Sequence, residues 1–187
     1  VVHDHCSISY NERFIFINIE CNAHLQRDLQ KTADETGHIE PIEIKNLITE
    51  TIKARNDLIE KGIGEFESRY VDDFNNKLDE ILSRAKATAE ANNSIYSGPF
   101  ERAVISRIIN YRDNFFAWVT DFSIPTTNNL SERALRGVKT KMRVSGQFAS
   151  TKTTNNYARI RSYIETCRRN GINEIEALIR LCRGNPY

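Results

Sequence analysis

The stretch PIEIKNLITETIKARNDLIE, residues 41–60, and the stretch FESRYVDDFNNKLDEILSRA, residues 66–85, decide the fold class. Apolar residues recur in both at intervals of three and four, the spacing that lines one face of an α-helix. Pro41 suits the first turn of a helix, and Gly62 and Gly64 lie where a turn can join two helices. The sequence therefore predicts two long helices joined by a tight turn, an αα-hairpin.

The segments on either side of this hairpin also have mostly helical patterns. Apolar spacing, capping residues and terminal glycines predict further helices over residues 21–35, 99–120, 129–143, 155–170 and 173–183. Only residues 1–4 and 14–19 have the apolar, β-branched or aromatic character of strands. We therefore predict a mostly α chain with a small β remnant at its start, an α+β fold class.

Composition excludes several classes of protein. The chain has 187 residues, of which 40% are hydrophobic and 27% charged, so it is not fibrous, collagenous or disordered. Purely apolar runs such as residues 14–17 and 115–119 are far shorter than the roughly 20 residues of a membrane helix, and no signal-peptide pattern opens the chain. We expect a soluble, cytoplasmic protein without a membrane partner. Because the chain opens with the strand-like Val1 and Val2, we also expect a segment upstream of it.

Charge is divided unequally along the chain. Residues 128–187 contain 12 lysines or arginines and 4 acidic residues, whereas residues 1–127 contain 14 and 21. The net charges of these two parts are +8 and −7, although the whole chain has only +1. A strongly basic segment is typical of proteins that bind a polyanion, so we expect the C-terminal part to bind nucleic acid.

The most informative segment is NNLSERALRGVKTKMR, residues 128–143. At about 100° per residue, one acid and three bases fall within an arc of about 60° of a helix. These residues are Glu132, Arg136, Lys139 and Arg143. The apolar Leu135, Val138 and Met142 lie together on a neighbouring face, which we expect to pack.

Two interpretations of Glu132 are open at this point. A stripe of cations suits DNA phosphates, and an acid within it could hold a metal ion. From spacing alone we favour a structural role, in which Glu132 completes a capping box begun by Asn129 and pairs with Arg136.

Asp4 and the cysteine and histidine residues are further candidate ligands. Asp4 ends a short apolar strand, where a carboxylate can bind Mg²⁺, although such an aspartate more often opens a turn. A zinc site could use residues from the set His3, His5, Cys6, Cys21 and His24. Their spacing is loose, so we favour buried packing for them. We also expect the core to contain Cys167, Cys182, Phe66, Tyr70, Phe74, Phe115 and Trp118.

Several spaced motifs occur near the two ends of the chain. Toward the C-terminus they are residues 124–136 (IPTTNNLSERALR), Lys139, Lys141, residues 145–150 (SGQFAS) and residues 157–162 (YARIRS). Toward the N-terminus they are residues 2–4 (VHD), Tyr10 and residues 21–29 (CNAHLQRDL). Together, and in this order, the motifs resemble those of insertion-sequence sixty-six family transposases. The chain has Ala149 and Arg143 where the family tends to have arginine and lysine.

The resemblance implies a DDE-type transposase with an RNase H-like core that is interrupted by a long helical insertion. Asp4 would be the second catalytic acid and Glu132 the third, whereas the first acid would lie upstream of this chain. The three acids would hold two Mg²⁺ or Mn²⁺ ions for strand cleavage and joining, so this chain alone would be inactive. The DNA-binding residues would be Asn128, Asn129, Arg133, Arg136, Lys139, Lys141 and Arg143.

The same resemblance implies partners and a division of the chain. The partners would be double-stranded DNA (transposon ends and target), further copies of the protein, accessory transposition proteins and the nucleoid. Residues 1–38 would start the catalytic core, residues 39–97 would form the hairpin insertion, and residues 98–187 would hold the third acid and the basic helix.

Two alternatives remain open. The chain could be a helical DNA-binding module without catalytic activity, in which Glu132 only caps a helix. The hairpin could be an interaction surface, although we favour a hairpin that simply packs on the core.

Overall fold

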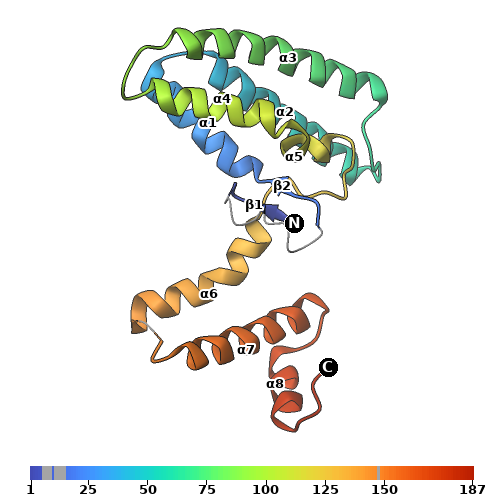
Figure 1. The fold of residues 1–187 in the computed structure, drawn as a ribbon. Helices are drawn as coiled ribbons and strands as arrows, with labels where there is room; N and C mark the ends of the chain where they lie inside the picture. The colour runs from blue at the N-terminus through green and yellow to red at the C-terminus, as the bar shows by residue number, and fades with distance from the viewer. Residues whose placement is uncertain (6–9, 11–15, 147) are drawn as a thin grey trace. The chain divides into compact units, whose positions relative to one another are not determined.

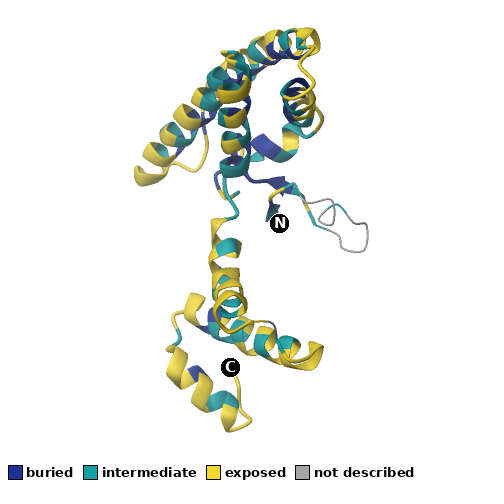
Figure 2. Ribbon diagram, turned by 90° about the vertical axis from the view of Figure 1, so that its left-hand side faces the viewer, coloured by how far each residue is buried: buried dark blue, intermediate teal, exposed yellow. Residues whose placement is uncertain are grey.

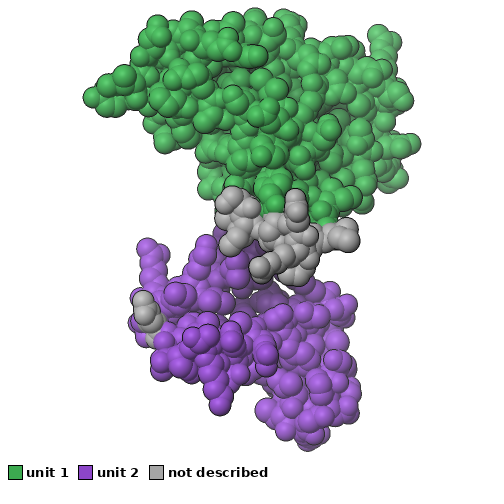
Figure 3. Space-filling view, viewed as in Figure 1, with its two compact units in different colours: residues 1–128 green, residues 129–187 purple. Residues whose placement is uncertain are grey.

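The computed structural model describes residues 1–5, 10, 16–146 and 148–187, and it divides into two compact units. Unit 1 comprises residues 1–128 and unit 2 comprises residues 129–187, as coloured in Figure 3. The predicted boundary between residues 97 and 98 falls inside unit 1.

Unit 1 begins with a sheet of two short parallel strands. β1 (Val2–His3) pairs with β2 (Ile19–Glu20), and His3 lies opposite Glu20 in the register. The amide of Ile19 donates to the carbonyl of Val1 at 2.9 Å, and the amide of Cys21 donates to that of His3 at 2.8 Å. The strand predicted over residues 1–4 is confirmed. Of the strand predicted over 14–19, residues 14 and 15 lie outside the described residues, and the described part forms a strand only at Ile19.

Four helices make up most of unit 1. They are α1 (Asn22–Thr36), α2 (Glu40–Glu60), α3 (Ser68–Ala91) and α4 (Gly98–Asn110). α1 packs against α2 and α4, and α3 packs against the same two helices, so the four form a closed bundle (Figure 1). The turns after α1 and α2 use Gly37 and Gly62 at φ of 73° and 76°, which glycine adopts without steric cost. The predicted αα-hairpin and the helix before it are confirmed.

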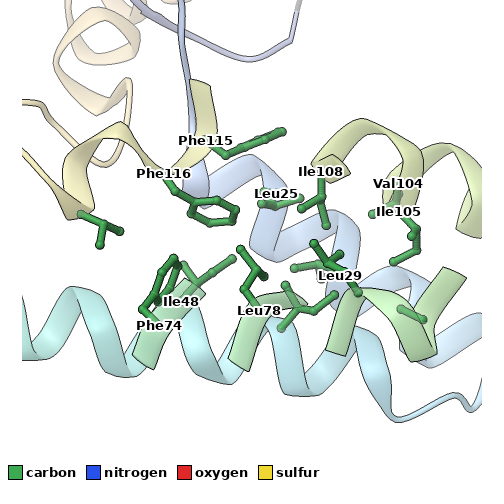
Figure 4. Packing of buried hydrophobic residues seen from close by; sticks show 14 of the residues in the cluster. Leu25, Leu29, Ile48, Phe74, Leu78, Val104, Ile105, Ile108, Phe115 and Phe116 are labelled. Atoms are coloured by element: carbon green, nitrogen blue, oxygen red, sulfur yellow. The ribbon is translucent and has the colours of Figure 1, made fainter. Parts of the chain in front are cut away.

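The core of unit 1 lies between these four helices (Figure 4). Leu25 and Leu29 of α1 meet Ile48 of α2, Phe74 of α3 and Ile108 of α4, and all five side chains are buried. Burial of apolar surface contributes about 25 cal/mol per Å² to folding, so these contacts hold the bundle together. The hairpin is therefore part of the core of unit 1.

The single helix predicted over residues 99–120 is wrong, because the chain forms three shorter pieces. α4 is followed by α5 (Arg112–Phe116) and by a 3₁₀ turn, Ala117–Val119. The break is at Tyr111, whose φ of −118° and ψ of 29° are not helical. The bend lets Phe115, Phe116 and Trp118 all be buried. Of the aromatic residues predicted for the core, Tyr70 alone is exposed, at 37%.

Unit 2 consists of α6 (Asn129–Ser145), α7 (Thr151–Arg169) and α8 (Glu174–Cys182). Among its described residues only Glu165, Cys167 and Ala177 are buried. Figure 2 accordingly shows this unit largely in the colour of exposed residues. α7 begins before the predicted residue 155, because the Ser150 hydroxyl caps it by accepting from the amide of Thr153 at 3.2 Å. The prediction that Cys182 is a core residue is wrong, since α8 leaves this thiol exposed.

Candidate active site and basic helix

Asp4 lies exposed in a turn directly after β1, and its two neighbours fix that turn. His3 is buried, and its Nε2 lies 3.0 Å from Oδ1 of Asn18. The backbone amide of His5 donates to Nδ1 of His3 at 3.3 Å. His5 itself has a φ of 61°, a left-handed conformation that is uncommon for residues other than glycine. The structure therefore places the predicted ligand Asp4 at the surface of unit 1, on a constrained turn.

Sequence reasoning missed Glu20, which is only 1% exposed and lies beside this turn. Its Oε1 lies 2.7 Å from Nδ1 of His5, and it also accepts a hydrogen bond from the hydroxyl of Tyr10. Burial, followed by the hydrogen bond and negative charge of Glu20, holds the pKa of Tyr10 well above its usual value. A glutamate at the end of a strand has no sequence pattern that indicates these contacts, because they depend on the pairing of β2 with β1.

A cavity of about 210 Å³ adjoins the Asp4 turn. Its lining includes Asp4, Glu20, His24 and Phe115, together with Asp28 and Arg107, which form an ion pair. No group of three histidine, cysteine or acidic side chains among the described residues is placed to hold a metal ion.

The predicted packing role of Cys21 is confirmed. Its Sγ accepts a hydrogen bond from the amide of Asn128 at 3.4 Å, which ties the start of α1 to the end of unit 1. Cys6 of the possible zinc set lies outside the described residues. The side-chain Oδ1 of Asn128, a predicted DNA contact, is buried.

Glu132 lies in the first turn of α6, where the positive end of the helix dipole favours a carboxylate. The bases of the predicted stripe, Arg136, Lys139 and Arg143, are exposed along the same helix, as is Arg133. Lys141 is partly buried, with its Nζ 4.7 Å from the centre of the Phe148 ring. None of the residues of α6 is buried, so the stripe is open to a large ligand such as DNA.

The apolar face predicted for α6 is only partly covered. Leu135 and Val138 line a hollow of about 240 Å³ against α7, which confirms that this side faces a neighbouring helix. Leu135 and Met142 nevertheless stay 54% and 48% exposed.

The arginines of α7 differ from those of α6, because several are engaged within unit 2. Arg161 donates to Glu165 at 2.8 Å, and Arg168 pairs with Glu165 and lies 3.7 Å from Glu174. Arg169 donates to the carbonyl of Leu130 at 3.3 Å. Paired guanidinium groups neutralise fewer phosphates, so Arg161 and Arg168 are less available to a polyanion than the exposed cations of α6.

A family model, described as the Transposase IS66 family, matches residues 8–156, which is most of the chain. The chain belongs to the Transposase IS66 family. The suspected resemblance is thereby confirmed, and DNA is the substrate class of this transposase family. The match includes Glu132 and all of α6, whereas Asp4 precedes it. Neither the curated proteins nor the solved structures include a significant match to the chain.

Within the described part of the chain, every helix is too short or too polar to cross a lipid bilayer.

Proposed function

We propose that this IS66 family chain contributes Asp4 and Glu132 to the metal centre of a transposase that cleaves and joins DNA strands at the ends of an insertion sequence. The observation that carries the proposal is the setting of Glu132. It is an acid in the first turn of an exposed, basic helix, inside the segment that the transposase family model matches. Asp4 supports the proposal as an exposed carboxylate on a constrained turn.

The chemistry of the two side chains fits Mg²⁺ or Mn²⁺, because these hard cations prefer carboxylate oxygens. When bound, two such ions supply activation of the attacking oxygen and stabilisation of the leaving oxygen. The resemblance implies a centre of three acids, of which Asp4 and Glu132 would be two. We therefore propose that residues 1–187 alone are inactive. We also propose that β1 and β2 belong to an RNase H-like core.

The cations of α6 would bind the phosphate backbone beside the carboxylates. Arg133, Arg136, Lys139 and Arg143 are exposed on one helix, where they can neutralise successive phosphates. Contacts of this kind fix the position of the DNA without reading its sequence, and so would hold the scissile phosphate in place.

Glu132→Gln in the full-length transposase tests this proposal. The substitution removes the charge and keeps the size, so a metal ligand is lost while the helix end stays capped. We expect strand cleavage to fall at least about 100-fold, as for loss of a central electrostatic group, with DNA affinity retained.

The chain offers a matched control in Glu176→Gln. Glu176 also follows an asparagine by three residues, and its amide donates to Oδ1 of that residue, Asn173, at 3.3 Å. We expect this variant to retain cleavage. If Glu132→Gln is as active as Glu176→Gln, Glu132 is only a capping residue and the alternative of a non-catalytic DNA-binding helix replaces the proposal.

A further inference from the structure

His5, the residue after Asp4, is held in a conformation that its own backbone disfavours. Its φ of 61° lies in the left-handed region, and among the described residues other than glycine no second one has a positive φ. Side chains with a Cβ are strained there, so such a conformation persists only where surrounding contacts impose it. The side chain of His5 makes such a contact, because its Nδ1 lies 2.7 Å from Oε1 of Glu20.

Glu20 is a rigid anchor for this bond. It lies on β2 directly opposite His3 in the strand register, and it is 1% exposed. The hydroxyl of Tyr10 donates to the same oxygen, and the ring of Tyr111 packs edge-on against His5, with the ring centres 4.8 Å apart. The carboxylate of Glu20 therefore has little freedom to move.

The hydrogen bonds of His3 and His5, the two neighbours of Asp4, indicate which ring nitrogen of each histidine carries the proton. A carboxylate oxygen only accepts, so His5 carries its proton on Nδ1 toward Glu20. His3 accepts the amide of His5 at Nδ1 and so carries its proton on Nε2, toward Oδ1 of Asn18. Hydrogen bonds thus join His5 to Glu20 of β2 and His3 to Asn18, just before β2. Of residues 3–5, only Asp4 is exposed.

We propose that Glu20 is a positioning residue for Asp4. By holding His5 at positive φ, its buried carboxylate sets the direction in which the Asp4 carboxylate leaves β1. Without Glu20, His5 relaxes to an ordinary conformation and the peptide between Asp4 and His5 rotates. This inference rests on the proposed function, in which Asp4 is a metal ligand.

Mn²⁺ binding to the full-length transposase tests the inference, with free Mn²⁺ followed by electron paramagnetic resonance. Loss of a group that orients a metal ligand typically weakens metal binding 10- to 100-fold, and we expect about that for Glu20→Ala. The matched control is Glu101→Ala. Glu101 is also 1% exposed and lies 2.7 Å from a histidine, His38, but it is on α4 and has no bond to the Asp4 turn.

Hydrogen exchange of the His5 amide gives a second readout, independent of metal. The bond from this amide to His3 depends on the turn, so Glu20→Ala should raise its exchange at least about tenfold, whereas Glu101→Ala should not. Equal Mn²⁺ affinities and equal exchange in the two variants would overturn the inference.

Two further variants keep the test decisive. If Glu20→Ala does not fold, Glu20→Gln is compared with Glu101→Gln, and an Mn²⁺ affinity weaker by about threefold or more supports the inference, whereas equal affinities overturn it. If Asp4→Asn binds Mn²⁺ as tightly as the wild type, the proposed function fails. If Asp4→Asn weakens binding and Glu20→Ala does not, only the positioning role fails.

Discussion

The buried side chain of Glu20 affects the pKa of its neighbour Tyr10. The hydroxyl of Tyr10 donates to Glu20, so ionisation would place a second negative charge next to that carboxylate. Burial and Glu20 therefore raise the pKa of Tyr10 above the ordinary value of 10.0. In the unfolded chain the same hydroxyl ionises near its ordinary pKa, so unfolding releases a proton in alkaline solution and the stabilising effect of Tyr10 decreases there.

The pH dependence of unfolding in urea checks this effect. Below about pH 9 we expect Tyr10→Phe to be less stable than the wild type, because Glu20 loses a donor. Above about pH 10 the difference should shrink, by at most about 1.4 kcal/mol per pH unit, since only the wild type has this proton to lose. A difference that is constant from pH 8 to pH 11 would contradict the raised pKa.

Gly98 lies so close to the neighbouring backbone that there is no room for a Cβ at this position. A Cβ at this position would lie 2.6 Å from the backbone carbonyl oxygen of Asn92, which cannot move aside without shifting the end of α3. We expect Gly98→Ala to lower the free energy of unfolding by about 1–3 kcal/mol, measured by denaturant titration.

Gly64→Ala is the control for this substitution. Nothing lies within 4 Å of a Cβ at Gly64, so the free energy of unfolding should stay within about 0.5 kcal/mol of the wild type. Equal effects of the two substitutions would contradict the close approach at Gly98.

Individual residues also show what the sequence can and cannot predict. Asp4 and Glu132 could be singled out because each sits in a motif of fixed spacing. Glu20 could not, since its partners His5 and Tyr10 reach it only after β1 and β2 pair across more than a dozen residues. Periodicity reports which face of an element is apolar, and it carries no information on which strand lies next to it.

At the scale of elements, helix ends marked by glycine were predictable, and bends were not. Gly37 ends α1 and Gly62 follows α2, as their backbone angles require. The break at Tyr111 has no such marker, because the apolar spacing continues through it and only the burial of Phe115 and Phe116 requires the bend. Tertiary packing therefore overrides local pattern between α4 and α5.

The cations of the basic helix α6 should determine how strongly the DNA affinity of the transposase depends on salt concentration. If about five of its cations bind phosphates, the logarithm of the affinity should fall with that of the salt concentration at a slope of about −4 to −5. Replacing Arg136 and Lys139 with alanine should make the slope shallower by about 2, measured by fluorescence anisotropy from 50 to 300 mM salt.

A matched double variant on α7 provides the control. Arg161 and Arg168 are both paired with Glu165, so replacing them with alanine should change the slope by less than about 1. A slope near zero for the wild type, or equal changes in the two double variants, would remove α6 from the DNA interface.

At the scale of the whole molecule, the mostly helical class and the place of the hairpin were predictable. α2 and α3 contribute Ile48, Phe74 and Leu78 to the core, so the hairpin is a structural part of unit 1. The division of the chain between residues 128 and 129 was not predictable, since the gap between the helices predicted over residues 99–120 and 129–143 is equally typical of a short loop within one domain.

We propose that Asp4 and Glu132 hold metal ions in one centre, and a crystal structure of the full-length transposase soaked in Mn²⁺ would test this. We expect anomalous density at two ions about 3.5–4 Å apart, bound by both carboxylates. Two carboxylates on different surfaces with no shared ion would contradict it.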